Sequence, residues 1–257
     1  MQNVLIVIPV RLGSTRFPKK CFARINGEEM LKIVAKNALE TNYSVCVATP
    51  DIEVIDKVGE YALKDVFDKN LFHYQTSPNN RTGNEAVAEV AANLKEYAVI
   101  VNLQGDEPTI TSEDITKAVQ YKLDNIDAII NGCTFCAASD AKLTTNIKMV
   151  TNTNNELVYA SRSIVPNISK NRSEGVLFLK QVGLFIFNRK QSVTLYGDIN
   201  KPKSKMEELE DVCILRAIND KIPVKLFNIS HKVQSVDVPT DLAKVERIRG
   251  QNDTCNA

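Results

Sequence analysis

The chain of 257 residues has no tryptophan, two histidines and few aromatic side chains, which make up 6% of the total. This composition weakens the case for a platform on which bases of single-stranded nucleic acid stack. The formal net charge of +1 provides no overall field that would attract nucleic acid. The N-terminal apolar run, residues 4–10, is too short to span a membrane and lacks the basic lead and cleavage site of a signal peptide. We therefore expect a cytoplasmic protein that engages neither nucleic acid nor membrane.

The cysteines do not form the pattern of a disulfide framework, since the six are scattered along a long chain. Cys133 and Cys136 form one CxxC motif, but a zinc site would need two further ligands, and the chain has no second CxxC and no HxxxH. A redox dithiol normally opens a helix after a strand, whereas this pair lies inside an apolar run. We expect reduced, structural cysteines, with a metal or redox role as the alternative.

Apolar runs alternate with segments of helical periodicity in the first half of the chain. Expected strands cover residues 4–10, 44–50 and 98–104, and expected helices cover 30–39, 52–62, 83–94 and 111–121. In the less regular second half we expect a hairpin within 147–162 that turns near Asn154 and Asn155, strands over 181–188 and 224–229, and helices over 206–219 and 239–249. Strands that are apolar on both faces and alternate with helices predict an α/β protein with a mostly parallel sheet covered on both sides. One domain over residues 1–257, with a hairpin-containing excursion at roughly 145–205, is the simplest organisation.

Two polar clusters follow two of the expected strands. The sequence "RLGSTRFPKK" at residues 11–20 follows the first strand, and "LQGDEP" at residues 103–108 follows the strand at 98–104. Ligands of open parallel sheets bind beyond the carboxyl ends of the strands, so the two clusters are expected to face each other across a cleft. Arg and Lys bind phosphate oxygens, and Asp106 suits Mg²⁺, which takes one or two protein carboxylates and fills its remaining positions with phosphates and water. The clusters predict a metal–polyphosphate site, with a solvated basic loop as the alternative.

The basic loop contains neither GxGxxG nor GxxxxGK[ST], so a dinucleotide-binding fold and a P-loop NTPase lose their main support. A second carboxylate for the metal is expected from "SVDVPTDL", where Asp237 lies between an expected strand and an expected helix. The alternative for Asp237 is an N-cap of that helix. Neither His73 nor His231 lies near these motifs, so we do not expect acid–base catalysis by histidine.

Four motifs, "IPVRLGSTRFPKK", "NLQGDEP", "ASRSIVP" and "VDVPTDL", occur in the order expected of the CMP-Kdo synthetases, the 3-deoxy-manno-octulosonate cytidylyltransferases. The chain resembles this family from about residue 4 to residue 247. The resemblance implies a nucleotidyltransferase fold with a Rossmann-like sheet, Mg²⁺ as cofactor, and CTP and an acidic 3-deoxy-2-keto sugar as substrates. It also implies attack of the sugar's anomeric hydroxyl on the α-phosphate of CTP, a role in lipopolysaccharide biosynthesis, and a homodimer whose contact and sugar site involve the excursion.

The resemblance further implies roles for individual residues. Arg16, Lys20, Asp106 and Asp237 are expected to be catalytic, and the two aspartates to hold Mg²⁺. The residues expected to contact CTP are Arg11, Leu12, Ser14, Arg16, Lys20, Arg81 and Gly83. The residues expected around the sugar are Gln104, Arg162, Gln181, Phe185 and Glu210, with Arg162 facing the carboxylate region and Glu210 a hydroxyl. Without the resemblance, Arg162 and Glu210 read equally well as solvated or structural charges.

The sequence departs from the family pattern in two places, both in the half expected to hold the sugar. "RTGNE" at residues 81–85 stands where the family has an SGTER-like segment. Ala86 follows it at the position where the family has an arginine, and we expect Arg81, a few positions earlier, to compensate. "QVGLF" replaces an HLGIY-like segment, with Gln181 for a histidine and Phe185 for a tyrosine. One alternative is therefore a synthetase that uses another eight- or nine-carbon 3-deoxy-2-keto acid, such as a CMP-nonulosonate synthetase. The others are a nucleotidyltransferase acting on a sugar 1-phosphate and a non-catalytic nucleotide-binding relative.

Overall fold

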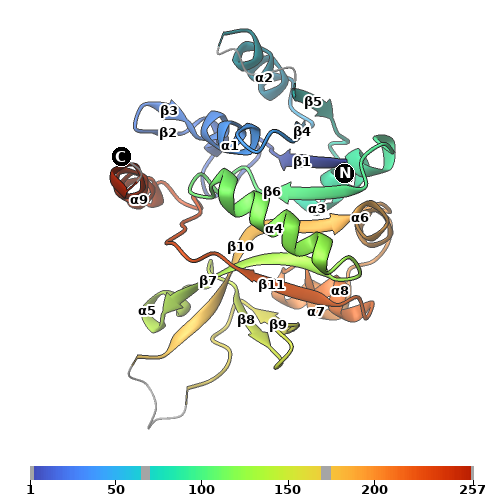
Figure 1. The fold of residues 1–257 in the computed structure, drawn as a ribbon, viewed down its shortest axis with the longest axis vertical. Coiled ribbons are helices and arrows are strands. Elements are labelled where there is room, and N and C mark those ends of the chain that lie inside the picture. Colours follow the sequence, from blue (N-terminus) through green and yellow to red (C-terminus); the bar gives the residue numbers. More distant parts are fainter. Residues whose placement is uncertain (1–2, 65–69, 169–174, 256–257) are drawn as a thin grey trace.

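A nine-stranded sheet forms the centre of the molecule in a computed structural model, which describes residues 3–64, 70–168 and 175–255 (Figure 1). The strand order is β11-β7-β10-β6-β1-β4-β5, and the β8–β9 hairpin pairs with β10. The strands are β1 (Val4–Pro9), β4 (Ser44–Thr49), β5 (Leu71–Gln75), β6 (Val99–Leu103), β7 (Ile129–Ala137), β8 (Lys148–Thr151), β9 (Leu157–Ser161), β10 (Leu177–Asn188) and β11 (Val224–Asn228). A separate small hairpin joins β2 (Arg24–Ile25) to β3 (Glu28–Glu29).

The sheet is mostly parallel, as the sequence predicts. Strands β6, β1, β4 and β5 are parallel neighbours, and β11 runs parallel to β7. Strand β10 lies between β6 and β7 and is antiparallel to both. The long β10 therefore joins the N-terminal parallel half to the rest of the sheet, and its N-terminal end carries β8.

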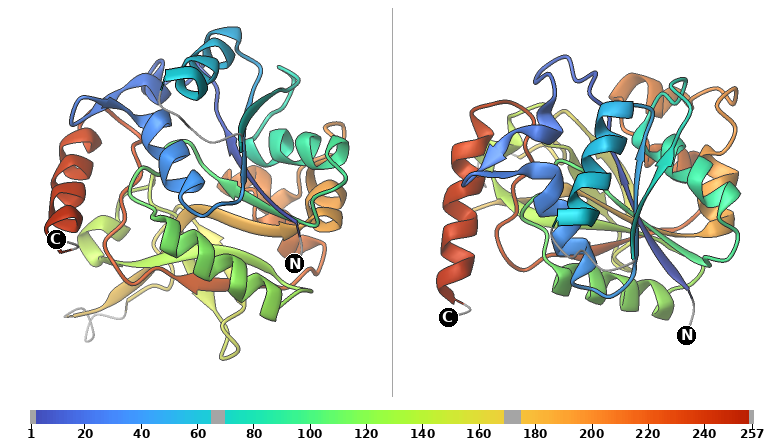
Figure 2. Two further views of the ribbon diagram at one scale, coloured as in Figure 1. Left: turned by 45° about the horizontal axis from the view of Figure 1, so that its top comes forward. Right: turned by 90° about the horizontal axis from the view of Figure 1, so that it is seen from above.

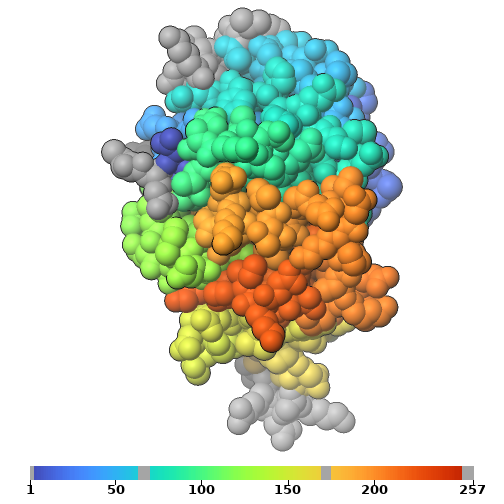
Figure 3. Space-filling model, turned by 90° about the vertical axis from the view of Figure 1, so that its right-hand side faces the viewer, coloured from blue at the N-terminus to red at the C-terminus, as the bar shows by residue number. Residues whose placement is uncertain are grey.

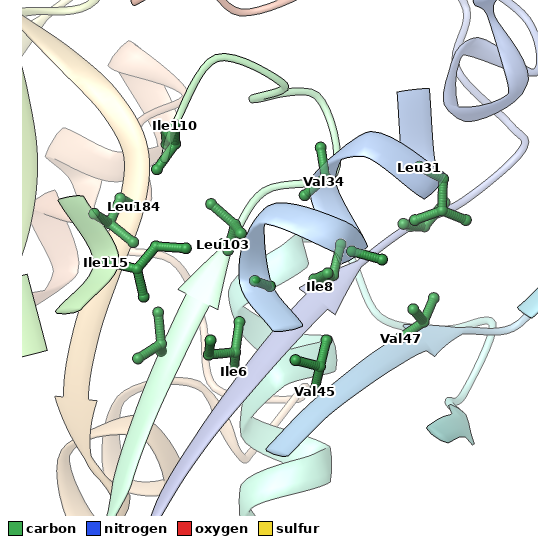
Figure 4. Close-up of a cluster of buried hydrophobic side chains, with 14 of the residues drawn as sticks. Ile6, Ile8, Leu31, Val34, Val45, Val47, Leu103, Ile110, Ile115 and Leu184 are labelled. Atoms are coloured by element: carbon green, nitrogen blue, oxygen red, sulfur yellow. The ribbon is translucent and has the colours of Figure 1, made fainter. Parts of the chain in front are cut away.

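Helices cover both faces, which explains why the central strands are apolar on both sides. Alternate residues of β1 divide between two clusters. Ile6 and Ile8 pack with α1, α2 and α4 (Figure 4), whereas Leu5 and Val7 pack with α3. Figure 3 shows α3 and α6 side by side on the second face. The helices are η1 (Lys20–Phe22), α1 (Met30–Leu39), α2 (Ile52–Lys64), α3 (Gly83–Asn93), α4 (Ser112–Asp124), α5 (Ala138–Ala141), α6 (Arg189–Tyr196), α7 (Lys205–Glu210), α8 (Leu215–Asn219) and α9 (Asp241–Cys255).

The prediction of one helix over residues 206–219 is wrong. Two short helices, α7 and α8, replace it because Asp211 adopts a left-handed conformation with φ 50° and ψ 48°. Across the break, the Arg216 guanidinium forms two hydrogen bonds with the Glu207 carboxylate, at 2.8 and 2.7 Å. Residues nine apart in a continuous α-helix point in directions about 180° apart, so this buried pair requires the chain to turn.

The expected hairpin within residues 147–162 is confirmed by β8 and β9, with Asn155 in the turn at φ 59°. Cys133 and Cys136 lie in β7, and both are buried in hydrophobic clusters. Burial raises the pKa of the Cys133 thiol to about 12, which favours the unreactive thiol. No helix in the described part of the chain is long and apolar enough to cross a membrane.

The C-terminal helix α9 packs beside the β2–β3 hairpin, far from β11 in the sheet (Figure 2). The chain between β11 and α9 therefore crosses the end of the sheet. Along this crossing, the backbone N–H of Val236 donates to the carbonyl of Asp106 at 2.9 Å. This contact brings the motif that contains Asp237 next to the loop after β6.

Candidate active site

A cavity of about 490 Å³ lies where β1, β4, β5 and β6 end and the segments that follow them begin. The basic loop after β1 and the acidic loop after β6 both line it, as the sequence predicts for adjacent parallel strands. The opposite wall comes from the loop before β8, from β10, and from the break between α7 and α8. The expected residues that line the cavity are Arg11, Ser14, Arg16, Lys20, Gly83, Gln104, Asp106, Arg162, Gln181, Phe185 and Asp237.

Backbone contacts hold the basic loop in shape. The N–H of Leu12 donates to Oδ2 of Asp51 at 2.7 Å, and the N–H of Ser14 donates to the carbonyl of Leu12 at 2.9 Å. The side chain of Lys19 turns away to Glu53. Lys20 and Arg16 are therefore the loop cations that reach the acidic side of the cavity.

The two loop cations each pair with one of the expected metal ligands. Lys20 Nζ lies 2.6 Å from Oδ2 of Asp106, and Arg16 Nη2 lies 3.0 Å from Oδ1 of Asp237. Asp237 does not use its carboxylate to cap α9. Instead, the carboxylate of Asp241 accepts hydrogen bonds from the N–H groups of residues 237 and 238.

Asp106 and Asp237 suit a divalent cation by charge and by donor type. Burial, and then the negative charge of Asp106, raise the pKa of the Asp237 carboxyl, so the two carboxylates lie close enough to repel each other. A cation between them would relieve that repulsion, and oxygen ligands are those that Mg²⁺ prefers. Among the described residues no group of three or more metal-ligating side chains forms, so a metal here needs further ligands from phosphate or water.

Glu107 is a buried acid at the floor of the cavity that the site prediction did not include. Its Oε1 accepts a hydrogen bond from the N–H of Gly183 at 2.7 Å. Burial is the main cause that raises the pKa of Glu107 to about 8 from its usual 4.5, and the charge of Asp106 raises it further. A Cβ at residue 183 would lie 2.9 Å from Glu107, so only glycine allows this approach.

The wall contributed by β10 carries Gln181 and Phe185. The amide nitrogen of Gln181 donates to Oδ1 of Asn131 at 2.8 Å, which fixes the side chain across the sheet. Phe185 is buried and stacks on Phe187, with ring centroids 6.4 Å apart. This part of the wall therefore presents an amide and an aromatic ring to the cavity.

Arg162 lines the cavity, but the chain itself already engages its guanidinium. Nε donates to the carbonyl of Glu210 at 2.9 Å, Nη1 to Thr144, and Nη2 to the carbonyl and carboxylate of Asp211. The Glu210 carboxylate accepts hydrogen bonds from the hydroxyl of Ser161 and the N–H of Arg162, and from Tyr159. Burial alone would raise the pKa of Glu210, but these hydrogen bonds bring it below its usual range.

Three expected site residues are absent from the described lining of the cavity: Leu12, Arg81 and Glu210. Leu12 helps to shape the basic loop through the hydrogen bond from its backbone N–H to Asp51. Glu210 helps to position Arg162 by accepting a hydrogen bond from its backbone N–H. Arg81 donates to the buried Glu85 at 2.6 Å and to the carbonyl of Lys201, so it does not take the place of the arginine that Ala86 replaces. Ala86 itself lines the cavity.

Other lining residues escaped the prediction. Lys180 and Asp211 are charged, and Thr76 places a buried hydroxyl without a hydrogen-bond partner in the described structure. A signal for Lys180 was its position beside Gln181, which the sequence did single out. Asp211 carried no such signal, because it lay inside the expected helix.

Comparisons with known proteins identify the family of the chain. The sequence model of the cytidylyltransferase family matches residues 5–225. The 3-deoxy-manno-octulosonate cytidylyltransferase of Lawsonia intracellularis is 31% identical over 249 residues, which are 95% of this chain and 93% of the relative. The Escherichia coli protein of that name is 30% identical over 262 residues, which cover 100% of both chains.

A solved structure of a protein with a related name is also similar to this chain. CMP:2-keto-3-deoxy-manno-octonic acid synthetase complexed with CTP superposes with a TM-score of 0.82 at 30% identity, over 98% of this chain and 100% of that one. A glucose-1-phosphate thymidylyltransferase from Bacillus anthracis, at 12% identity and a TM-score of 0.68, shares the fold. The chain therefore belongs to the cytidylyltransferase family of nucleotidyltransferases, together with the 3-deoxy-manno-octulosonate cytidylyltransferases.

Proposed function

We propose that this protein transfers CMP from CTP to a 3-deoxy-2-keto sugar acid, 3-deoxy-manno-octulosonate, and releases pyrophosphate. The observation that carries the proposal is the meeting of Lys20 with Asp106, and of Arg16 with Asp237, in one cavity. A cationic loop beside paired carboxylates matches the charge of a metal-bound triphosphate. The names of the full-length relatives support the choice of CTP and of the acid.

Asp106 and Asp237 would hold Mg²⁺, which when bound neutralises phosphate charge and orients the triphosphate. Arg16 and Lys20 would bind phosphate oxygens, together with Arg11 and Ser14 from the same loop. Their positive charge offsets the charge that develops on the leaving pyrophosphate, which is the usual role of arginine and lysine clamps in phosphoryl chemistry.

Both ion pairs have to exchange partners for this function. Lys20 and Arg16 each leave an aspartate for a phosphate, while the aspartates turn to the cation. If only one ligand bound, the partner groups displaced from the two ion pairs would stay unpaired. Nucleotide and Mg²⁺ should therefore bind cooperatively.

The acid would lie against the wall formed by β10 and the loop before β8, with Gln104 at the boundary between the two substrates. Gln104 follows β6, and its N–H donates to the carbonyl of Gly183 at 2.9 Å, so this bond fixes the acidic loop against β10. Such a rigid join would align the attacking hydroxyl with the α-phosphate, which is a major source of rate enhancement.

Pyrophosphate release from CTP and Mg²⁺, in the presence of a panel of 3-deoxy-2-keto acids, tests the proposal. We expect Asp106→Asn and Asp237→Asn to lower kcat by about 100-fold or more, since each removes a carboxylate from the metal. Asp56→Asn is the matched control, because Asp56 is exposed on α2. A near-wild-type rate in either site variant would contradict the metal assignment.

The same panel decides among the alternatives. Preference for a nine-carbon acid would indicate a CMP-nonulosonate synthetase, and use of a sugar 1-phosphate with UTP or GTP would indicate a different nucleotidyltransferase. Binding of CTP without pyrophosphate release would indicate a non-catalytic relative. As part of the proposal we expect a cytoplasmic homodimer that serves lipopolysaccharide biosynthesis, with the excursion at 145–205 in the dimer contact.

A further inference from the structure

Lys180 is an unusual side chain in the wall of the cavity. It lies in β10, is only 8% exposed, and lines the cavity beside Gln181. Within the described part of the chain its ammonium forms no hydrogen bond and no ion pair. A buried lysine is costly unless a partner compensates its charge, so this residue calls for an anion.

The other cations near Lys180 already have partners. The guanidinium nitrogens of Arg162 donate to the backbone carbonyls of Glu210, Thr144 and Asp211. Lys148 is fully buried and donates to the carbonyls of Leu143, Asn146 and Arg162 at 3.1, 2.5 and 2.5 Å. Both side chains therefore serve to shape the wall.

Lys180 and Lys148 are also direct cross-strand partners between β10 and β8. Opposed residues of an antiparallel pair place their side chains on one face, where like charges destabilise each other. Burial, together with the charge of Arg162, lowers the pKa of Lys148. The two ammonium groups therefore repel each other, and a carboxylate bound by Lys180 would relieve that repulsion.

The charge of Lys180 partly offsets the rise in the pKa of Glu107 that burial and Asp106 cause, so the two groups interact through space. In the described structure, however, no ion pair within 4.0 Å joins them, and Oε1 of Glu107 accepts from Gly183. Glu107 therefore leaves the ammonium of Lys180 available on the side of the cavity.

We propose that Lys180 binds the carboxylate of the acidic sugar and so selects acids over neutral sugars. This proposal rests on the proposed function, whose second substrate is an acid, and it moves the carboxylate contact from Arg162 to Lys180. Arg162 and Lys148 then act as positioning residues that hold the surrounding loops.

The test compares 3-deoxy-manno-octulosonate with its carboxamide, which is similar in shape but neutral, as substrates of wild type and Lys180→Met. A charge-assisted hydrogen bond leads us to expect that Lys180→Met raises KM for the acid about tenfold to 100-fold. KM for CTP should change little, and the wild-type preference for acid over carboxamide should fall by the same factor as the acid's loss. A merely structural role would weaken acid and carboxamide alike.

Lys180→Arg is the second variant, because it keeps the charge and should keep most of the preference for the acid. Lys142→Met is the control, since Lys142 is exposed and lies after α5. Wild-type KM for the acid in Lys180→Met, or an unchanged ratio of acid to carboxamide, would overturn the proposal while pyrophosphate release from CTP continued.

Failure of the proposed function has a different signature, which is no pyrophosphate from the wild type with any acid. Equilibrium binding of the acid in the presence of CMP then decides for Lys180. Binding to the wild type that Lys180→Met loses would support the carboxylate site. Equal binding by both proteins, or binding by neither, would overturn it.

Discussion

At the scale of single residues, Lys20 and Asp106 are each other's partner, so removing one has opposite effects on two ligands. In Lys20→Met, Asp106 no longer has a competing ammonium, and we expect tighter binding of Mg²⁺ alone. Binding of CTP with Mg²⁺ should weaken, and kcat should fall about 100-fold, as for loss of one transition-state donor. Titration calorimetry with and without CTP measures the two changes in binding, and pyrophosphate release measures kcat. Lys19→Met is the matched control, because Lys19 pairs with Glu53, and equal effects of the two variants would contradict the assignment.

Glu107 makes a prediction about pH at the same scale. Its pKa of about 8 lies above its usual 4.5, so the folded protein keeps a proton that the unfolded chain loses. The free energy of unfolding should therefore fall as pH rises between those values in metal-free buffer, by at most about 1.4 kcal/mol per pH unit. Glu107→Gln should remove this contribution, whereas Glu113→Gln, on the exposed face of α4, should keep it. Urea unfolding at several pH values measures the difference, and parallel curves for wild type and Glu107→Gln would argue against it.

At the scale of elements, the break between α7 and α8 is stabilised by the buried pair of Glu207 and Arg216. Glu207→Gln removes the carboxylate that accepts two hydrogen bonds from Arg216 and leaves only the more distant Glu85, at 3.7 Å. We expect a loss of about 3 kcal/mol in the free energy of unfolding. Glu208→Gln, next in sequence but exposed, should cost little. Chemical denaturation compares them. A loss equal to that of Glu208→Gln would show that the pair does not hold the break.

The same break marks what the sequence alone could not predict. Apolar periodicity identified β1, β4 and β6 and most of the helices that cover them, because these segments have regular patterns. The pattern at 206–219 is also regular, but the left-handed Asp211 and the contact between Glu207 and Arg216 are tertiary features. Periodicity carries no information about them.

At the scale of the whole molecule, the cavity joins segments that are far apart in the chain. The basic loop follows β1, Asp106 follows β6, and Asp237 arrives from beyond β11 through the bond between Val236 and Asp106. The motifs predicted this meeting correctly, since parallel strands end at one edge. Burial and partners decided the rest: Arg81 faces Glu85, and Lys180 emerged because β10 places it, buried, in the cavity wall.

The measurement that tests the central claim most directly is ³¹P NMR of a reaction containing the protein, CTP, Mg²⁺ and 3-deoxy-manno-octulosonate. We expect the CTP signals to decline while pyrophosphate and a phosphodiester of CMP with the sugar grow in equal amounts. Asp106→Asn should leave the CTP signals unchanged over the same time. Persistent CTP signals with folded wild-type protein, for this acid and for every other acid of the panel, would contradict the claim.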